Sequence, residues 1–329
     1  MGEMRRTPKE APVPVHEKGE APVFSVIIPT YGDGPLVQRA VESVLDQRFR
    51  DFEVLVVDDA GDPPAELGPH ESVNLLRRPV NGGAGAARNT GLKAARGEWA
   101  AFLDADDIWF PERLGAFAEV LAKGTIGPGD ALTTDLEVHD TDGSVSLYSE
   151  HRPFKKTDQA YHQIRRPFLT ALFAARRQHL LDLGGFNEEL RNGEDSELLL
   201  RLIFAGGTVH YIDRPLARYY RGTGKSSGQR RLWTSQITQL EMLLALDLSD
   251  NERTAALKRL EYVKEQLGTA IVNQVREDLL RGEGRREDIL KALSARSARG
   301  GTRLLFTLGL VSPRLAQMAG RVVAPERSA

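Results

Sequence analysis

Short apolar segments rich in valine and isoleucine alternate with helical patterns from residue 24 to about residue 210. Strand-like segments lie at residues 23–28, 53–57, 74–77 and 99–103, and such short apolar runs are typical of buried strands. Between the first two, apolar side chains recur on one helical face: Leu36, Val37, Ala40, Val41, Val44 and Leu45. This alternation predicts an α/β fold with a mainly parallel sheet flanked by helices, and ligands at the carboxyl ends of the strands.

The pattern changes at about residue 229, after which no convincing strand occurs. Ser249 and Glu252 have the spacing of a capping box, which predicts the start of a long helix. Leu260, Val263, Leu267 and Ala270 fall on one face of that helix. We therefore expect a disordered arm over residues 1–22, an α/β domain over 23–228 and a helical C-terminal region over 229–329.

Composition narrows the range of functions. The net charge of the 329 residues is −2, so the charge does not call for a nucleic-acid partner. The chain has no cysteine, which excludes disulfides and thiolate chemistry and fits a cytoplasmic setting. The longest late apolar run, residues 304–311, is far shorter than the roughly 20 residues of a membrane-spanning helix, and we expect none.

The strongest chemical signal is the sequence Asp104-Ala105-Asp106 directly after an apolar strand. Residues two apart on an extended chain point to the same side, so both carboxylates can face one divalent cation. Ligands that are all oxygen suit Mg²⁺ or Mn²⁺. The alternative is a polar loop whose aspartates, Asp107 in particular, cap the helix after Pro111.

Two other strand ends carry residues suited to a nucleobase. Tyr31 follows the first strand and offers a flat ring on which a base can stack. Asp59 follows the second strand, and its carboxylate can accept the imide N–H of uracil or thymine. In the alternative interpretation, Tyr31 covers the edge of the core and Asp59 starts a turn.

A glycine-rich loop over residues 81–89 opens a helix, where backbone N–H groups can meet phosphates. The dinucleotide fingerprint fails, because Arg88 stands where the third glycine belongs and the loop follows the third strand. Hydride chemistry is therefore disfavoured. Arg88 is either a cation near a diphosphate or a member of a surface salt bridge.

Further along the chain, Asp195 follows Gly193 and Glu194 and precedes a helical segment over residues 197–203. A carboxylate at a helix start can take the proton of an acceptor hydroxyl. It can equally cap the helix, and the two roles are compatible.

Taken in order, these segments resemble the family 2 glycosyltransferases, whose catalytic domain has the GT-A fold. The resemblance covers roughly residues 23–225 and rests on the ordered set rather than on any single member. The matching segments are residues 25–31, 56–59, 81–97, 102–109, 184–186 and 194–195.

The resemblance implies a role for each residue. Pro29, Tyr31 and Asp59 would hold the nucleobase, Asp104 the ribose and the metal, and Asp106 the metal on the diphosphate. A nucleotide-diphospho-sugar is the implied donor, with UDP favoured and dTDP or GDP compatible. The acceptor would be a carbohydrate or a lipid-linked sugar in cell-surface polysaccharide or glycolipid synthesis.

The resemblance also implies an inverting displacement, with Asp195 as the catalytic base and no protein nucleophile. After the second strand the chain has Ala60-Gly61 where the family usually has Gly-Ser. The family's frequent histidine is absent from residues 220–227, and Arg221 and Lys225 could take its place on the diphosphate. The Gln-x-x-Arg-Trp signature of processive synthases is absent as well, which favours a single transfer.

Two other functions remain in competition. A nucleotidyltransferase would need a glycine-rich basic signature after the first strand, where this chain has Pro29 to Pro35. A non-catalytic sugar-nucleotide-binding protein would not need the three aspartates.

The last part of the chain carries one acid, Glu326, among a set of basic residues, with apolar residues 304–308 beside them. This part is compatible with a solvated helix surface, a homodimer contact or peripheral contact with the inner face of a membrane. The basic residues are Lys291, Arg296, Arg299, Arg303, Arg314, Arg321 and Arg327.

Overall fold

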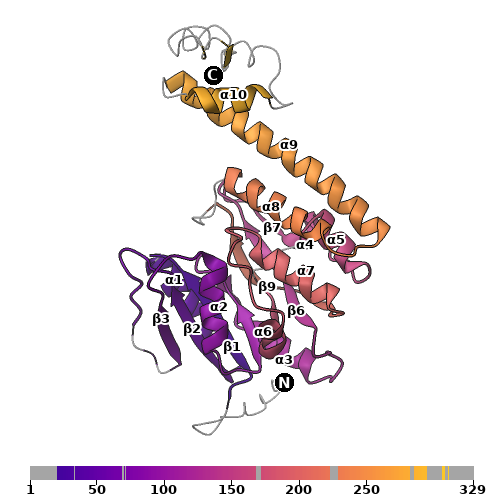
Figure 1. The fold of residues 1–329 in the computed structure, drawn as a ribbon. Helices are drawn as coiled ribbons and strands as arrows, with labels where there is room; N and C mark the ends of the chain where they lie inside the picture. Colours follow the sequence, from indigo (N-terminus) through magenta and orange to yellow (C-terminus); the bar gives the residue numbers. More distant parts are fainter. Residues whose placement is uncertain are drawn as a thin grey trace, which may run out of the picture. The chain divides into compact units, whose positions relative to one another are not determined.

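The computed structural model describes residues 21–32, 34–68, 70, 72–167, 172–222, 229–281, 285–294, 306–307 and 310 (Figure 1). These residues form two compact units. The sheet unit contains the described residues up to Glu189 and from Glu194 to Gly222, and the helical unit contains residues 190–193 and the described residues from Gln229 onward. The predicted arm over residues 1–22 lies almost wholly outside the described residues.

The sheet unit is built on one mixed sheet of nine described strands, in the order β3-β2-β1-β4-β8-β6-β9-β5, with β7 paired to β6. Strand β1 pairs in parallel with β2 and β4, and β2 pairs in parallel with β3. Strand β8 is antiparallel to both β4 and β6, while β6 and β9 are parallel. The strands are β1 Phe24–Thr30, β2 Phe52–Asp58, β3 Val73–Arg77, β4 Trp99–Phe102, β5 Ile108–Trp109, β6 Ala131–His139, β7 Val145–Leu147, β8 Ala174–Arg176 and β9 Val209–Tyr220.

Helices cover both faces of the sheet. Figure 1 shows α1 and α2 beside strands β1, β2 and β3. Successive strand residues point to opposite faces, and Val26 and Ile28 pack with α1 and α3, whereas Ile27 packs with α2 and α7. Apolar side chains are therefore needed at consecutive strand positions, which explains the continuous apolar runs. The helices of this unit are α1 Gly34–Leu45, α2 Ala84–Ala94, α3 Arg113–Leu121, α4 Tyr148–His151, α5 Gln159–Arg165, α6 Arg177–Asp182 and α7 Glu194–Phe204.

Glycine lets α2 lie close to the sheet. A Cβ atom on Gly91 would come within 2.6 Å of the Ile27 side chain and 3.2 Å of Val57. Helix α2 therefore rests directly on β1 and β2, and its first residues stand at the carboxyl ends of these strands.

The helical unit consists of α8 Gln229–Leu244, α9 Asp250–Arg281 and α10 Arg286–Ser294. The predicted capping box is present: the Ser249 N–H and hydroxyl both donate to Glu252 Oε2, and the Glu252 N–H donates to Ser249 Oγ at 3.4 Å. Phe306, one of the apolar residues that the sequence places beside the basic set, is buried against α9 and α10. Most of the basic set lies outside the described residues.

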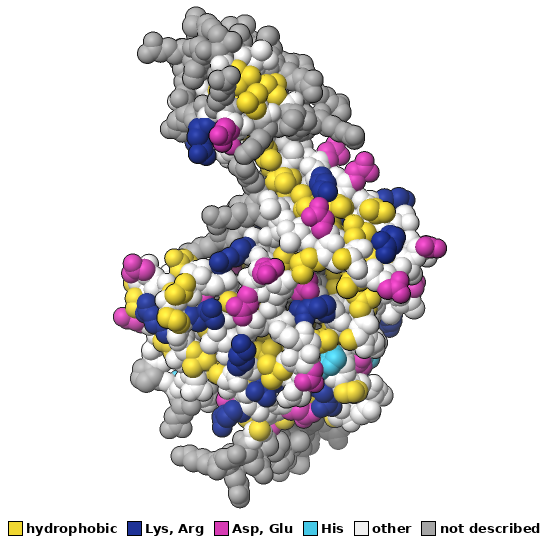
Figure 2. Space-filling view, in the orientation of Figure 1, with side chains coloured by type: hydrophobic (Ala, Val, Ile, Leu, Met, Phe, Trp, Pro, Cys, Tyr) yellow, Lys and Arg dark blue, Asp and Glu magenta, His cyan; other side chains and the backbone are white. Residues whose placement is uncertain are grey.

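Positive and negative side chains are interspersed over the face drawn in Figure 2, in keeping with the nearly balanced charge of the chain. Among the described helices, none combines the length and hydropathy needed to cross a bilayer.

Candidate active site

Three parallel strands bring the predicted site residues to one edge of the sheet. The register aligns Thr30 of β1 with Asp58 of β2, and Ile27 of β1 with Phe102 of β4. Tyr31, Asp59 and Asp104 follow these strands and therefore leave the sheet at the same edge. This is the edge at which α/β folds bind ligands.

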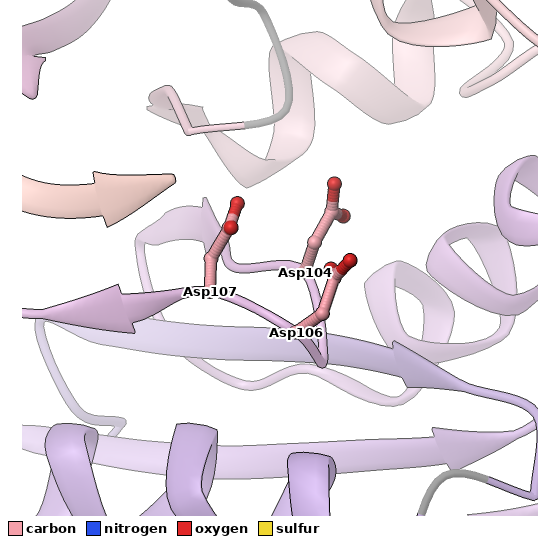
Figure 3. A group of neighbouring side chains, drawn as sticks. All are labelled: Asp104, Asp106 and Asp107. Carbon is pink, nitrogen blue, oxygen red and sulfur yellow. The ribbon is translucent and has the colours of Figure 1, made fainter. Parts of the chain in front are cut away.

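Asp104, Asp106 and Asp107 form an acidic cluster on the loop after β4. One carboxylate oxygen from each lies within 4.8 Å of the others. Figure 3 shows the three carboxyl groups pointing to the same side of the loop, away from the strands drawn beneath it. The spacing predicted for Asp104 and Asp106 is thus realised, and Asp107 joins them.

Asp107 does not cap α3, which corrects the alternative drawn from the sequence. Its Oδ1 accepts a hydrogen bond from the Tyr220 N–H at 3.1 Å, and the N-cap of α3 is Glu112. The side chain is 1% exposed, and its buried Oδ2 has no hydrogen-bond partner among the described residues. A buried, unsatisfied carboxylate oxygen beside two further carboxylates fits a divalent cation, because hard oxygen ligands suit Mg²⁺ or Mn²⁺.

The electrostatics of the cluster agree with this fit. Burial raises the pKa of Asp107 well above its usual value, and the charges of Asp104 and Asp106 raise it further. Burial also raises the pKa of Asp104, against the opposing effect of Arg88. A bound cation would reverse these shifts, because it stabilises the ionised carboxylates.

The acidic loop is fixed to the end of β9 by contacts that the sequence analysis missed. The Arg39 guanidinium donates to the Asp106 carbonyl at 3.0 Å and lies 4.6 Å from the centroid of the Tyr220 ring. Strand β5, which follows the loop, pairs with β9. Arg39 was missed because nothing in the sequence around it on α1 indicates that its partner is Asp106, 67 residues further along the chain.

On the nucleobase side, Tyr31 is 42% exposed, whereas Asp59 is buried. The Asp59 carboxylate accepts hydrogen bonds from the N–H groups of Gly82 and Gly83 and from Arg78 Nε, the last at 2.7 Å. Both oxygens already accept hydrogen bonds, so Asp59 shapes the glycine-rich loop. Recognition of a base by Asp59 stays a prediction.

Pro29 lies inside β1 opposite Val57, beyond the last residue of β1 that pairs with β4. Its missing N–H therefore costs no bond to that strand. The side chain is buried, and its contact with a nucleotide also stays a prediction.

The unusual turn after β2 is held by Asp58, whose Oδ1 accepts from the Gly61 N–H at 2.8 Å. A Cβ atom on Gly61 would lie 2.3 Å from the Gly32 nitrogen, so the turns after β1 and β2 pack backbone against backbone. With Ala60 and Gly61 in place of the family's usual Gly-Ser pair, the turns after β1 and β2 thus remain packed against each other.

Arg88 is buried and bridges two carboxylates, so the surface salt bridge considered from the sequence is wrong. Its guanidinium lies 2.5 Å from Asp104 Oδ1 and 2.6 Å from Glu194 Oε1. Burial lowers the pKa of Arg88, but the charges of Asp104, Glu194 and Asp195 outweigh that effect and raise it overall. Glu194 was missed as a site residue because its partner lies far away in the sequence.

Asp195 lies in the first turn of α7, where its Oδ1 accepts the N–H of Ser196 at 2.7 Å. Its neighbour Glu194 is joined to Asp104 through Arg88, so the first turn of α7 is linked to the acidic loop. The charge of Asp195 raises the pKa of both Asp104 and Arg88. Arg221 is half exposed and ion-paired with Asp140 at 2.7 Å. Lys225 lies outside the described residues.

Replacing Asp59 with asparagine is expected to lower the free energy of unfolding by about 2 kcal/mol or more. The amide has one accepting oxygen where the carboxylate has two, so hydrogen bonds to the loop are lost, and Arg78 loses its buried charge partner. Urea denaturation of this variant checks the prediction. Asp62→Asn, at an exposed residue of the same turn, is the control, and equal stability of the two variants would refute the structural role of Asp59.

Comparison with known proteins agrees with this geometry. Residues 25–184 match the family model described as glycosyl transferase family 2. This match spans β1, β2, β4 and the acidic loop. Over residues 25–184, just under half of its length, the chain matches the family 2 glycosyltransferases, and its sheet unit has the GT-A fold.

Among its relatives, an uncharacterized glycosyltransferase of Haemophilus influenzae is 26% identical over 62% of this chain and 70% of its own length. The succinoglycan biosynthesis protein ExoO of Rhizobium meliloti is 31% identical over 57% of this chain and 58% of its own length. A pre-mycofactocin glycosyltransferase of Mycobacterium tuberculosis is 29% identical over 57% of this chain and 40% of its own length. The chain thus spans about half the length of several relatives.

Solved structures share the fold. The S. aureus TarS fragment 1–349 in complex with UDP-GlcNAc has a TM-score of 0.57 at 18% identity, covering 92% of this chain and 93% of that one. The mannosyltransferase PcManGT of Pyrobaculum calidifontis, in complex with GDP-Man and Mn²⁺, has a TM-score of 0.53 at 19% identity, covering 95% and 91%.

Proposed function

We propose that this glycosyltransferase moves a single sugar from a nucleotide-diphosphate donor to an acceptor hydroxyl, with inversion at the anomeric carbon. The observation that carries this proposal is the acidic cluster of Asp104, Asp106 and Asp107 at the sheet edge, joined through Arg88 to the helix turn that holds Asp195. The chemistry is assigned to residues 23–228, with residues 229–329 as a helical appendage.

Asp106 and Asp107 would hold Mn²⁺ or Mg²⁺, with Asp104 beside them on the ribose and the metal. When bound, the cation supplies positive charge to the departing diphosphate. Tyr31 would stack on the base at the neighbouring strand end, and Asp59 would hold the glycine-rich loop in place. Arg221 and Lys225 are proposed as further cations for the diphosphate.

Asp195 would take the proton of the acceptor hydroxyl as that oxygen attacks the anomeric carbon. The bond from this carbon to the diphosphate oxygen breaks as the new glycosidic bond forms, and the nucleoside diphosphate leaves with the electron pair. One displacement inverts the centre and needs no protein nucleophile. General-base assistance of this kind contributes about 10²–10⁴-fold in rate.

We favour a UDP-sugar as the donor, with dTDP- and GDP-sugars as alternatives. The TarS complex with UDP-GlcNAc and the PcManGT complex with GDP-Man support both nucleotides. Relatives named for succinoglycan and O-antigen biosynthesis support a cell-surface polysaccharide or glycolipid as the product.

The test is turnover of UDP-, dTDP- and GDP-sugars with Mn²⁺, followed by phosphorus and proton NMR, with water or a simple sugar as acceptor. We expect one donor to release its nucleoside diphosphate and to give a product whose configuration at the anomeric carbon is inverted. A product of retained configuration would refute the single displacement. Pyrophosphate released from a nucleoside triphosphate and a sugar phosphate would instead identify a nucleotidyltransferase.

A further inference from the structure

Arg88 connects two parts of the site that are far apart in the sequence. It belongs to α2, Asp104 to the loop after β4, and Glu194 to the first turn of α7. The Arg88 side chain is 3% exposed and the Glu194 side chain 7%, whereas Asp104 is 29% exposed. The ring of Phe186 lies 5.4 Å from the guanidinium carbon. Of these three charged residues, Asp104 is therefore the most exposed, and its carboxylate faces the site.

Asn89, the residue after Arg88 on α2, also links α2 to the segment before α7. Asn89 Nδ2 donates to the Phe186 carbonyl at 2.8 Å, and Asn89 Oδ1 accepts from the Phe186 N–H at 2.8 Å. Gly185 has a φ of +71°, and a Cβ atom there would lie 2.4 Å from Asn89 Oδ1. A Cβ atom on Gly85 would meet Glu194 Cγ at 3.2 Å. These glycines let the turn before α7 close onto α2.

We propose that Arg88 and Glu194 are a positioning pair. Arg88 holds the Asp104 carboxylate of the acidic loop, which is the metal-binding loop of the proposed function, and Glu194 holds the first turn of α7, which carries Asp195. The pair thereby fixes the spacing between the Asp104 and Asp195 carboxylates. This inference rests on the proposed function, in which Asp104 and Asp106 face the metal and Asp195 faces the acceptor. Neither Arg88 nor Glu194 needs to touch the substrate.

The geometry fits positioning better than stabilisation of the fold. Buried ion pairs add little net stability, because desolvation of the charges offsets their attraction. Arginine presents its N–H groups in a rigid planar fork, and here two of its nitrogens, Nη1 and Nη2, each hold a different carboxylate. Lysine keeps the charge but is a flexible point donor, so it cannot hold both carboxylates at this spacing. Arg88→Lys therefore separates geometry from charge.

The experiment measures Mn²⁺ affinity from the free-ion electron paramagnetic resonance signal, with Mn²⁺ alone and with a mixture of UDP, dTDP and GDP. Arg88→Lys and Glu194→Gln are each expected to weaken Mn²⁺ binding by about 10-fold or more, the usual effect of losing a partner that orients a metal ligand. The Glu194 variant is the more informative of the two, because the Glu194 side chain is linked to Asp104 of the metal-binding loop through Arg88.

The matched control is Arg96→Lys, which alters an exposed arginine paired with Glu53 just beyond the end of α2. Its Mn²⁺ affinity is expected to equal that of the unaltered protein. Thermal unfolding of each variant shows whether it is folded, and if Arg88→Lys does not fold, Glu194→Gln carries the test.

Two failures are distinguishable. If the unaltered protein binds Mn²⁺ and Asp106→Ala abolishes binding, but the folded Arg88→Lys and Glu194→Gln variants bind normally, the positioning role is overturned and the proposed function stands. If the unaltered protein does not bind Mn²⁺ with any of the nucleotides, the proposed metal site itself fails.

Discussion

Replacing Asp106 with alanine is expected to weaken Mn²⁺-dependent binding of the nucleoside diphosphate by more than about 100-fold, since loss of even an outer-shell partner costs about 10–100-fold. Asp106 lies in the acidic cluster whose carboxyl groups point to the same side of the loop (Figure 3). Without this carboxylate the cation loses a direct ligand, and the two negative phosphates lose the charge that holds them at the sheet edge. The fold should survive, because Asp106 is only partly buried.

Calorimetric titration with UDP, dTDP and GDP, in the presence and absence of Mn²⁺, measures this effect. Asp46→Ala removes an exposed carboxylate just after α1 and is the matched control. The control should bind like the unaltered protein. Normal metal-dependent binding by the Asp106 variant would show that the acidic cluster is not the metal site.

The second large effect is expected for Asp195→Asn, which should lower kcat by about 10²–10⁴-fold, the range of a general base. The amide keeps the size of the side chain and can still accept the Ser196 N–H. It cannot take a proton from the acceptor. Affinity for the nucleoside diphosphate with Mn²⁺ should therefore stay close to that of the unaltered protein.

Sugar-nucleotide turnover and nucleotide titration, measured on the same preparation, separate these two effects. Glu189→Gln, an exposed acid shortly before α7, serves as the control and should keep full turnover. If Asp195→Asn turns over normally, another group is the base. If it loses nucleotide binding instead, Asp195 belongs to the donor site.

Much of the sheet could be predicted from the sequence, because β1, β2 and β4 are buried on both faces and read as continuous apolar runs. The capping box of Ser249 and Glu252 is equally local and was found for that reason. The antiparallel strand β8 was not predicted. Its three residues, Ala174–Arg176, are too short to show a period, and its place between β4 and β6 depends on distant partners.

For the site, the two-residue spacing of Asp104 and Asp106 after a strand was sufficient to predict their common direction. Arg78, Arg39 and Glu194 were missed, because each acts through a partner distant in sequence. Arg88 and Glu194 are separated by 106 positions. Such pairs follow from the packing of α2 and α7 onto the sheet, and no local pattern encodes them.

In the proposed function, the acidic cluster holds a divalent cation on the diphosphate of a sugar nucleotide. A crystal grown with Mn²⁺ and the best-bound nucleoside diphosphate, and measured for anomalous scattering, tests this directly. We predict one anomalous peak between the carboxylates of Asp104, Asp106 and Asp107, with the diphosphate on its far side and the base near Tyr31. A peak elsewhere, or a nucleotide bound at this edge without a peak, would show that the acidic cluster does not hold the cation.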